Sequence, residues 1–269
     1  MSGGASAWDG TGQRVVVTGA SSGIGAAAAV EAAKAGATVC LVARRAERLA
    51  EVVAQCREHV PWCQTVVADL SKLELIDDVA AEVTEALGGG VDVLVNNAGV
   101  PKRRSVRDMS PADVEGVMAM NYFSPVRLTL ALLPGMLERD HGDIVNVSSM
   151  GVHMVAYKVG AYSASKAALE MFTESLHVEL AGTGVRAHLF VPGTTLTEFS
   201  TPKDGNDPPF PLDPATAATA EQVGAELIHA LGEERLITYA TERDEATSAK
   251  KASDPNAFLA DMRKIFGGS

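Results

Sequence analysis

The feature that most constrains the fold of this chain is a regular alternation of short apolar runs with longer helical patterns. The apolar runs predict strands at 14–19, 37–43, 65–70, 91–97, 143–149, 185–191 and 235–240. Helical patterns lie at 25–36, 46–59, 72–87, 111–139 with a break near Asn121, 161–181 and 220–231. Strands that are apolar at nearly every position are covered on both faces, and alternation with helices makes their sheet parallel. We therefore expect an α/β fold: a doubly wound parallel sheet of about seven strands, with helices on both faces.

The rest of the chain gives no sign of a second domain. Its 269 residues, 46% of them hydrophobic, suffice for one substantial core. Residues 1–12 lack the regions of a signal peptide, so we interpret them as a flexible lead-in and 13–269 as one domain. A Pro-, Gly- and Thr-rich stretch predicts a substrate loop at about 193–215, and about 241–269 predicts a C-terminal extension with a helix at 257–266.

Charge and cysteine content narrow the partners and the compartment. Lys and Arg number 23 against 34 Asp and Glu, and this net charge of −11 argues against nucleic acid or an anionic membrane as a partner. No apolar run is long enough to span a bilayer. Cys40, Cys56 and Cys63 form no paired motif, and the six histidines show no metal-site spacing. We therefore expect a cytoplasmic protein without a bound metal.

A glycine-rich turn follows the first predicted strand. Parallel α/β sheets bind ligands beyond the carboxyl ends of their strands, and TGASSGIG at 18–25 lies at such an end. Small residues there let a pyrophosphate approach the backbone at a helix N-terminus. The spacing Gly-x-x-x-Gly-x-Gly differs from the commonest dinucleotide fingerprint, and a tight connection without a ligand is the alternative. The cofactor contacts expected here are Gly19, Ser21, Ser22, Gly23, Ile24 and Gly25.

Two arginines follow the second predicted strand and bear on the choice of cofactor. Arg44 and Arg45 stand where a carboxylate would hold a free ribose 2′-hydroxyl, and the first carboxylate comes only at Glu47. Arginine at a helix N-terminus opposes the helix dipole, which favours a role in binding a 2′-phosphate. We therefore expect NADP, with NAD as the alternative. If neither arginine binds a ligand, both are surface residues that open a helix.

Polar residues and turns after other strands extend this candidate site. Asp69 would bond an adenine amino group, or cap the next helix near Ser71. The NNAG bend at 96–99 would pass close to a ribose, or form a simple turn. The threonines of PGTTLT at 192–197 would reach a carboxamide or phosphate, or bond only within their turn. The cofactor contacts expected from these segments are Asp69, Leu70, Asn97, Ala98, Gly99, Pro192, Gly193, Thr195 and Thr197.

A Tyr-x-x-x-Lys pair follows the serines that end the fifth predicted strand. Tyr162 and Lys166, in YSASK, lie one helical turn apart and share a face. Alone this pair is a weak signal. Together TGASSGIG, NNAG, Asn121, VNVSS, YSASK and PGTTLT, in this order over residues 14–197, resemble the short-chain dehydrogenase/reductase family.

The resemblance implies a Rossmann-type fold and an NADP(H)-dependent oxidoreductase that interconverts a small-molecule carbonyl and a secondary alcohol. It also implies a homodimer or homotetramer, with the helices at 118–138 and 161–181 at an interface. An NAD-dependent alcohol dehydrogenase of the same family and a non-catalytic dinucleotide sensor are the alternatives. The implied catalytic residues are Asn121, Ser149, Tyr162 and Lys166; the cofactor would also contact Tyr162 and Lys166.

Each of these residues has an expected role. Tyr162 would be the general acid/base, with its pKa lowered by the Lys166 ammonium and the nicotinamide. Ser149 would hold the substrate oxygen and Asn121 would anchor a water. Ser148 remains the alternative to Ser149, because Gly151 follows it by three residues.

Other residues near the expected ligand edge have less specific interpretations. We interpret His153 as a surface or core histidine rather than a substrate contact. KRR at 102–104 is interpreted as a solvated charge cluster, with a partner for an acidic substrate group as the alternative. Phe199, Phe210 and Leu212 in the substrate loop favour an apolar or mixed substrate.

Overall fold

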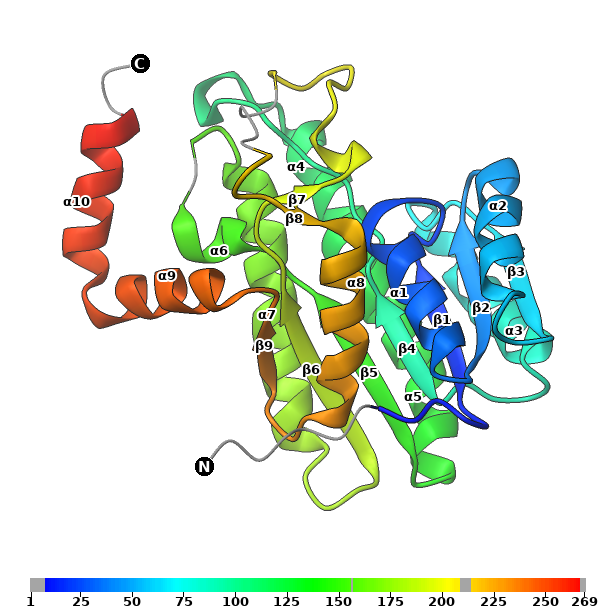
Figure 1. Ribbon diagram of the computed structural model, residues 1–269. Coiled ribbons are helices and arrows are strands. Elements are labelled where there is room, and N and C mark those ends of the chain that lie inside the picture. The colour runs from blue at the N-terminus through cyan, green and yellow to red at the C-terminus, as the bar shows by residue number, and fades with distance from the viewer. Residues whose placement is uncertain (1–7, 156, 209–213, 267–269) are drawn as a thin grey trace.

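A seven-stranded parallel sheet forms the centre of the protein, in a computed structural model that describes residues 8–155, 157–208 and 214–266 (Figure 1). The strand order is β3-β2-β1-β4-β5-β6-β9. The predicted α/β fold and its seven main strands are confirmed. Their bounds are β1 Arg14–Thr18, β2 Thr38–Ala43, β3 Cys63–Val67, β4 Val93–Asn96, β5 Gly142–Val147, β6 Val185–Val191 and β9 Ile237–Tyr239.

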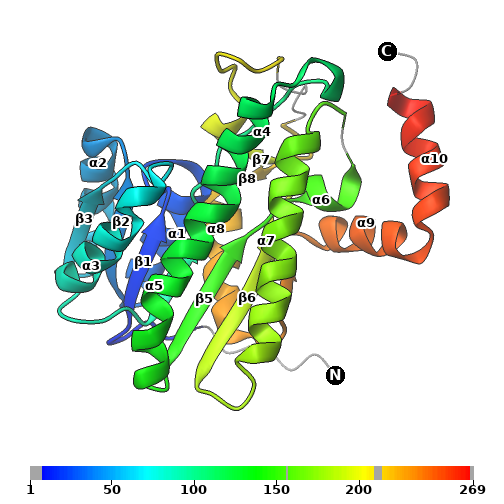
Figure 2. The same cartoon turned by 180° about the vertical axis from the view of Figure 1, so that it is seen from behind.

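Helices cover both faces of the sheet, as the apolar strands require. One face carries α1 (Gly23–Lys34), α2 (Ala46–Cys56) and α8 (Ala220–His229), and Figure 2 shows α3 (Ile76–Ala86), α5 (Ser124–Glu138) and α7 (Gly160–Glu179) on the other. Successive strand residues point to opposite faces. In β1, Val15 and Val17 therefore join the core under α1, whereas Val16 joins the core under α3.

The chain reverses its direction of progress across the sheet at β1. This strand pairs in parallel with β2 on one side and β4 on the other. The connections after β1 and β4 therefore leave toward opposite faces, and a crevice opens at the carboxyl ends of the strands.

The helical pattern at 111–139 forms one helical run with a π-helical turn inside it. Helix α4 (Pro111–Met118) begins with a capping box between Ser110 and Asp113, and α5 follows the π turn at Ala119–Phe123. The predicted break near Asn121 is this π turn, which widens the helix without ending it.

Several short elements were not predicted. Helix α9 (Glu242–Ser253) precedes the expected terminal helix, α10 (Pro255–Phe266), and the two extend away from the β9 edge of the sheet (Figure 1). Helix α6 (Met150–Met154) and the two-stranded sheet of β7 (Thr195–Leu196) and β8 (Ala218–Thr219) flank the crevice. Each is too short, or in α9 too polar, for an apolar period to show in the sequence.

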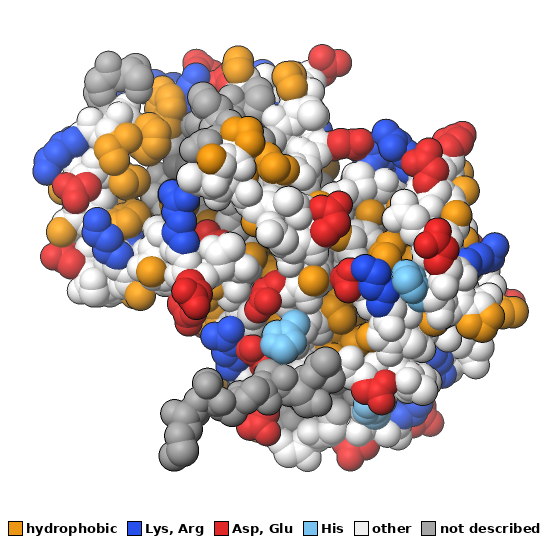
Figure 3. Space-filling view, viewed as in Figure 1, with side chains coloured by type: hydrophobic (Ala, Val, Ile, Leu, Met, Phe, Trp, Pro, Cys, Tyr) orange, Lys and Arg blue, Asp and Glu red, His pale blue; other side chains and the backbone are white. Residues whose placement is uncertain are grey.

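The N-terminal segment was expected to be a flexible lead-in, and the surface was expected to be acidic overall. Of the predicted lead-in, Trp8 packs against the core and the Gly10 N–H donates to Ala35 O at 3.0 Å, so residues 8–12 are held against the domain. Figure 3 shows acidic and basic side chains interspersed over one face of the molecule. None of the described helices combines the length and the apolar character needed to cross a membrane.

Candidate active site

A cavity of about 820 Å³ opens at the carboxyl ends of the strands. It is lined by the turns that follow β1, β2, β4, β5 and β6, together with α7. Gly25, Asp69 and Asn121 are the predicted site residues outside this lining. The structure brings the others together around the cavity: Gly19, Ser21, Ser22, Gly23, Ile24, Arg44, Arg45, Leu70, Asn97, Ala98, Gly99, Ser149, Tyr162, Lys166, Pro192, Gly193, Thr195 and Thr197.

The glycine-rich turn packs against the NNAG bend and leaves a helix N-terminus facing the cavity. Gly19 has φ +67°, and a Cβ there would lie 2.9 Å from Ala98 Cα. A side chain on Gly25 would overlap the Asn97 amide, so this glycine serves packing rather than ligand contact. The Ser22 hydroxyl makes no capping bond to α1. First-turn N–H groups of α1 are thus available to an anion such as a phosphate.

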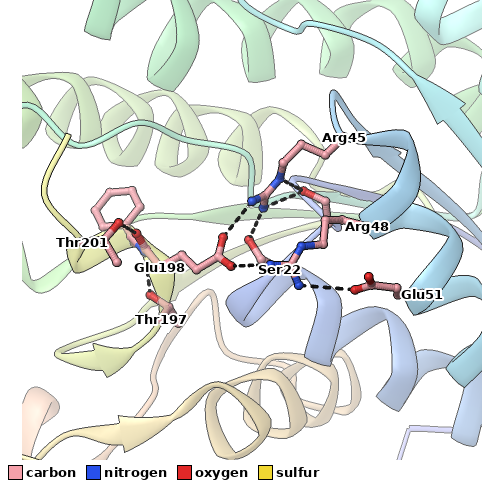
Figure 4. A network of polar contacts seen from close by, with 9 residues as sticks. Ser22, Arg45, Arg48, Glu51, Thr197, Glu198 and Thr201 are labelled. Atoms are coloured by element: carbon pink, nitrogen blue, oxygen red, sulfur yellow. Dashed lines mark hydrogen bonds and ion pairs between the residues drawn. The ribbon is translucent and has the colours of Figure 1, made fainter. Parts of the chain in front are cut away.

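The two arginines that follow β2 make different contacts. Arg45 donates to Ser22 Oγ at 2.7 Å and to Ser21 Oγ at 3.0 Å, so its guanidinium lies over the glycine-rich turn (Figure 4). Arg44 is 66% exposed, and its nearest carboxylate is Asp69 at 3.8 Å. Arg45 is therefore the better placed of the two to bind a phosphate at this turn.

Glu198 is a charged residue at the cavity that sequence reasoning missed. Its carboxylate accepts from Arg45 Nη1 at 2.8 Å and lies 3.4 Å from Arg48 Nη2 (Figure 4). The hydrogen bond with Arg45 lowers the pKa of Glu198 below its ordinary value. Its place directly after Thr197 was visible in the sequence, but the pairing across more than 150 residues was not.

Asp69 closes a local turn with Ser71 and does not cap a helix, because the next helical turn begins at Leu73 with Lys72 as its N-cap and no side-chain cap bond. Its Oδ1 accepts from the Ser71 N–H at 3.1 Å and from the Ser71 hydroxyl at 2.8 Å. A role in binding an adenine stays a prediction.

Tyr162 and Lys166 lie on α7 with Ser149 beside them. A Cβ on Gly151 would lie 3.3 Å from both Ser149 Oγ and Tyr162 Cε1, and Ser149 is close enough to Tyr162 to act on its pKa. Lys166 is 3% exposed and its Nζ donates to Val147 O at 2.7 Å. The three side chains therefore converge on one end of the cavity.

Burial is the main influence on the pKa values of Tyr162 and Lys166. Desolvation raises the pKa of Tyr162, and the hydrogen bond with Ser149 acts in the opposite direction. Desolvation also lowers the pKa of Lys166 to about 8, although Glu170 opposes it. The expectation that Lys166 lowers the pKa of Tyr162 is wrong for the protein by itself, because the ammonium is directed toward Val147 O rather than the phenol.

The two serines at the end of β5 point to different partners. Ser148 Oγ donates to the buried carboxylate of Glu170, whereas Ser149 lies beside Tyr162 and accepts from the Gly151 N–H at 3.0 Å. The Ser148 hydroxyl proton is therefore committed away from Tyr162. This geometry favours Ser149 as the serine that meets a substrate.

Asn121 lies fully buried in the π turn, behind the cavity. Its Nδ2 donates to Val100 O and to Ser165 Oγ, each at 3.1 Å, and its Oδ1 accepts from the Val100 N–H at 2.9 Å. Both amide hydrogens are thus used in holding the segment after β4 against α7. The water that the resemblance assigns to Asn121 stays a prediction.

The KRR run is not solvated, which corrects its interpretation. Arg103 is 5% exposed and donates to the carbonyls of Thr201, at 3.1 Å, and Asp207, at 3.3 Å. Lys102 pairs with Asp113. Their charges hold the substrate loop instead of facing water, because that loop folds over them and offers carbonyls as partners.

The remaining candidates are placed as follows. His153 does not line the cavity but bonds Glu170 and Ser248. Phe199 lies beside Tyr162, with ring centroids 5.8 Å apart, whereas Phe210 and Leu212 fall outside the described residues. Within the described ranges, no three His, Cys, Asp or Glu side chains are grouped to hold a metal ion.

Known proteins resemble this chain in sequence and in fold. The curated relatives include an uncharacterized oxidoreductase of Mycobacterium tuberculosis, 45% identical over 185 residues that make up 65% of this chain and 52% of that protein. A fatty acyl-CoA reductase of Acinetobacter baylyi is 42% identical over 63% of this chain and 58% of that protein. The chain thus spans just over half the length of these curated relatives.

Solved structures match over more of their length. A short-chain dehydrogenase from Streptomyces avermitilis is 32% identical with a TM-score of 0.79, covering 96% of this chain and 98% of that one. A short chain dehydrogenase/reductase from Burkholderia phymatum, in complex with NAD, is 25% identical with a TM-score of 0.82, covering 93% and 96%. The family model described as short chain dehydrogenase matches residues 13–207, well over half of the sequence. This chain therefore belongs to the short-chain dehydrogenase family.

Proposed function

We propose that this protein is an NADP(H)-dependent oxidoreductase that interconverts a carbonyl and a secondary alcohol. The observation that carries the proposal is one cavity with the glycine-rich turn at one end and Ser149, Tyr162 and Lys166 at the other. When bound, a nicotinamide dinucleotide supplies the hydride in reduction and accepts it in oxidation. A putative NAD(P)-dependent gluconate 5-dehydrogenase from Beutenbergia cavernae, solved with NADP at low occupancy, is 29% identical with a TM-score of 0.76, covering 88% of this chain and 98% of that one.

The chain's own groups fit a dinucleotide phosphate. The uncapped N-terminus of α1 offers backbone N–H groups to a pyrophosphate. Arg45, with the hydroxyls of Ser21 and Ser22, forms a cationic corner suited to a 2′-phosphate, which supports NADP over NAD. Lys166 Nζ would lie 3.6 Å from a Cβ on Gly99, so its ammonium is placed to bond ribose hydroxyls at the NNAG bend.

Tyr162 is the proposed general acid in reduction. Its raised pKa keeps the hydroxyl protonated at neutral pH, so it can donate a proton to the carbonyl oxygen as negative charge develops there. Ser149 donates a hydrogen bond to the same oxygen and orients it. Lys166 is charged below about pH 8, and its proposed part is to hold the cofactor ribose at the NNAG bend, since its ammonium is not directed at the phenol in the protein by itself.

The substrate class and the oligomeric state are proposed as well. The Phe199 ring beside Tyr162 supports an apolar or mixed carbonyl substrate, and long-chain aldehydes are a sensible class to test because one relative is a fatty acyl-CoA reductase. We propose a cytoplasmic homodimer or homotetramer, supported by exposed apolar residues on α5 and α7: Leu130, Leu137, Met171 and Val178.

Replacing the proposed acid tests the function. Tyr162→Phe should lower NADPH-dependent reduction of a responsive ketone or aldehyde by about a thousandfold, because the proton donor is lost. NADPH binding, measured by fluorescence titration, should stay within about twofold, since cofactor contacts elsewhere remain. Tyr157→Phe, on an exposed tyrosine outside the cavity lining, is the matched control.

Two outcomes would contradict the proposal. Full activity in Tyr162→Phe would remove Tyr162 from its role. NADPH binding by the wild type with no turnover over a broad panel of ketones, aldehydes and alcohols would favour the dinucleotide sensor. NADH and NADPH should be compared throughout, because equal efficiency with both would favour the NAD-dependent alternative.

A further inference from the structure

A chain of polar side chains runs behind Lys166 to the C-terminal extension. Glu170, on α7, accepts from the Ser148 hydroxyl and lies 3.2 Å from His153 Nε2. His153 Nδ1 lies 2.9 Å from Ser248 Oγ, on α9, and Ser248 lies 2.8 Å from the Tyr239 hydroxyl, on β9. Four elements besides α7 thus contribute to one hydrogen-bonded chain.

The chain has a consistent order of donors and acceptors. An ionised Glu170 only accepts, so Ser148 and His153 Nε2–H donate to it. In neutral His153 the other ring nitrogen then accepts from Ser248, whose oxygen accepts from Tyr239. With this order each of the four hydrogen bonds has one donor and one acceptor, and the Glu170 carboxylate sets the His153 proton on Nε2, which leaves Nδ1 to accept from Ser248 of α9.

Glu170 lies one helical turn beyond Lys166, on the same face of α7. Its side chain is 10% exposed and Lys166 is 3% exposed, so water screens their interaction only weakly. Burial disfavours the charged ammonium of Lys166, and a carboxylate at this place opposes that loss. No other carboxylate among the described residues contributes to the pKa of Lys166.

We propose that Glu170 is a positioning residue that keeps Lys166 protonated, and that Ser148, His153 and Ser248 hold its carboxylate in place. The C-terminal helix α9 would then complete the proton-transfer site without touching the substrate. This inference rests on the proposed function only for its effect on turnover; its effect on Lys166 rests on the placement of two buried side chains one turn apart on α7.

The titratable groups around this carboxylate come from several elements. Lys166 lies one turn before it on α7, His153 contacts it from α6, and Tyr239 is linked to it through Ser248 and His153. Lys251 of α9 is directed elsewhere, because its Nζ donates to Val152 O at 2.6 Å. Removing the negative charge of Glu170 therefore leaves Lys166 with burial as the main influence on its proton.

Glu170→Gln tests this directly, because glutamine keeps the shape and removes the charge. The measurement is the ¹³Cε chemical shift of Lys166 against pH in lysine-labelled protein, assigned by the loss of its signal in Lys166→Met. The wild-type midpoint should lie near pH 8, and Glu170→Gln should move it down by about one pH unit. Glu179→Gln, an exposed carboxylate on the same helix, should leave the midpoint in place.

Turnover gives the second readout. In Glu170→Gln, kcat/KM should fall by about tenfold at pH 8.5 and stay within about twofold at pH 6.5. A merely structural role would lower activity in parallel at all pH values. Ser248→Ala should shift the pH profile in the same direction by a smaller amount, and it serves if Glu170→Gln does not fold.

The role of Glu170 and the proposed oxidoreductase function can be disproved independently of each other. An unchanged Lys166 midpoint in Glu170→Gln, or in Ser248→Ala if the first variant is unfolded, overturns the inference whatever the turnover. A shifted midpoint in a protein that reduces no carbonyl compound upholds the inference and overturns the proposed function.

Discussion

Lys166 shows how burial opposes the positive charge that its proposed role requires. Its pKa is lowered by burial from 10.5 to about 8, so between these pH values the folded protein holds fewer protons than the unfolded chain. The free energy of unfolding therefore rises with pH across that window, and the full cost of burying the ammonium is present below pH 8. A residue that serves only stability would not be placed here.

Removing this charge should stabilise the protein. Lys166→Met should raise the free energy of unfolding at pH 7 by roughly 2 kcal/mol, a figure reduced by the lost bond to Val147 O, while activity is lost. The gain should shrink as the pH approaches 10.5. Urea denaturation at several pH values measures it, with exposed Lys264→Met as the control. A gain that is independent of pH would contradict the argument.

The two serines at the end of β5 make a second comparison of single residues. Ser149→Ala should lower kcat by about a hundredfold, because it removes the hydroxyl beside Tyr162. Ser148→Ala should lower kcat by less than about tenfold at pH 7, since it acts through Glu170. Steady-state kinetics on both variants decides between them. The reverse ranking would assign the substrate contact to Ser148.

Among the elements, the loop after β6 and the start of α2 meet across the cavity. Glu198, in the loop, bonds Arg45, at the N-cap of α2, and also approaches Arg48. The same guanidinium is the proposed partner of a 2′-phosphate. A carboxylate and a phosphate would compete for it, so the proposed affinity for NADP would depend on a residue far from the glycine-rich turn in sequence.

Glu198→Gln should therefore tighten binding of NADPH by about tenfold and leave NADH within about twofold. The first effect follows from removing a negative charge beside the phosphate, and the second from the lack of that phosphate in NADH. Fluorescence titration at constant ionic strength measures both. Glu51→Gln removes the other carboxylate partner of Arg48, at 3.3 Å, and is the control. Weaker NADPH binding in Glu198→Gln would show that Glu198 orients the arginines instead of competing.

The elements also show where sequence reasoning succeeds. The strand runs and the long helices were predictable because their apolar periods report burial directly. The site turns were predictable because small residues follow those strands. Helix α9 was not, since its polar sequence buries little beyond Ser248. Glu198 and Glu170 were missed, and the buried Arg103 was misinterpreted as solvated, because their roles depend on partners brought near only by the fold.

At the scale of the whole molecule, helices α5 and α7 carry large apolar side chains that are exposed in a single copy of the chain. Both helices cover the face of the sheet seen in Figure 2, and Leu130, Met171 and Val178 are 56%, 62% and 71% exposed. Contact with the same face of a second copy would bury them, and a two-fold axis makes such an interface self-complementary.

Met171→Glu should then lower the assembly state. Light scattering after gel filtration should give two or four chains for the wild type and a smaller assembly for the variant, because a charge at the centre of an apolar contact is costly to bury. Ile265→Glu, 63% exposed on α10, makes the same change elsewhere and should keep the wild-type mass. A monomeric wild type would contradict this interface.

The π turn at Ala119–Phe123 determines the directions in which the side chains of the following helix α5 point. Each residue of an α-helix advances the side-chain direction by roughly 100°, so deleting one residue here would rotate α5 by about that angle relative to α4. Buried Leu128 would turn off the sheet, Thr129 would take the direction of Leu128 and lose its contact with Asn96, now 3.1 Å, and Leu130 would turn toward the sheet. The turn therefore acts as a spacer whose length must be kept for Asn121 to hold the segment after β4 while α5 presents its apolar residues outward.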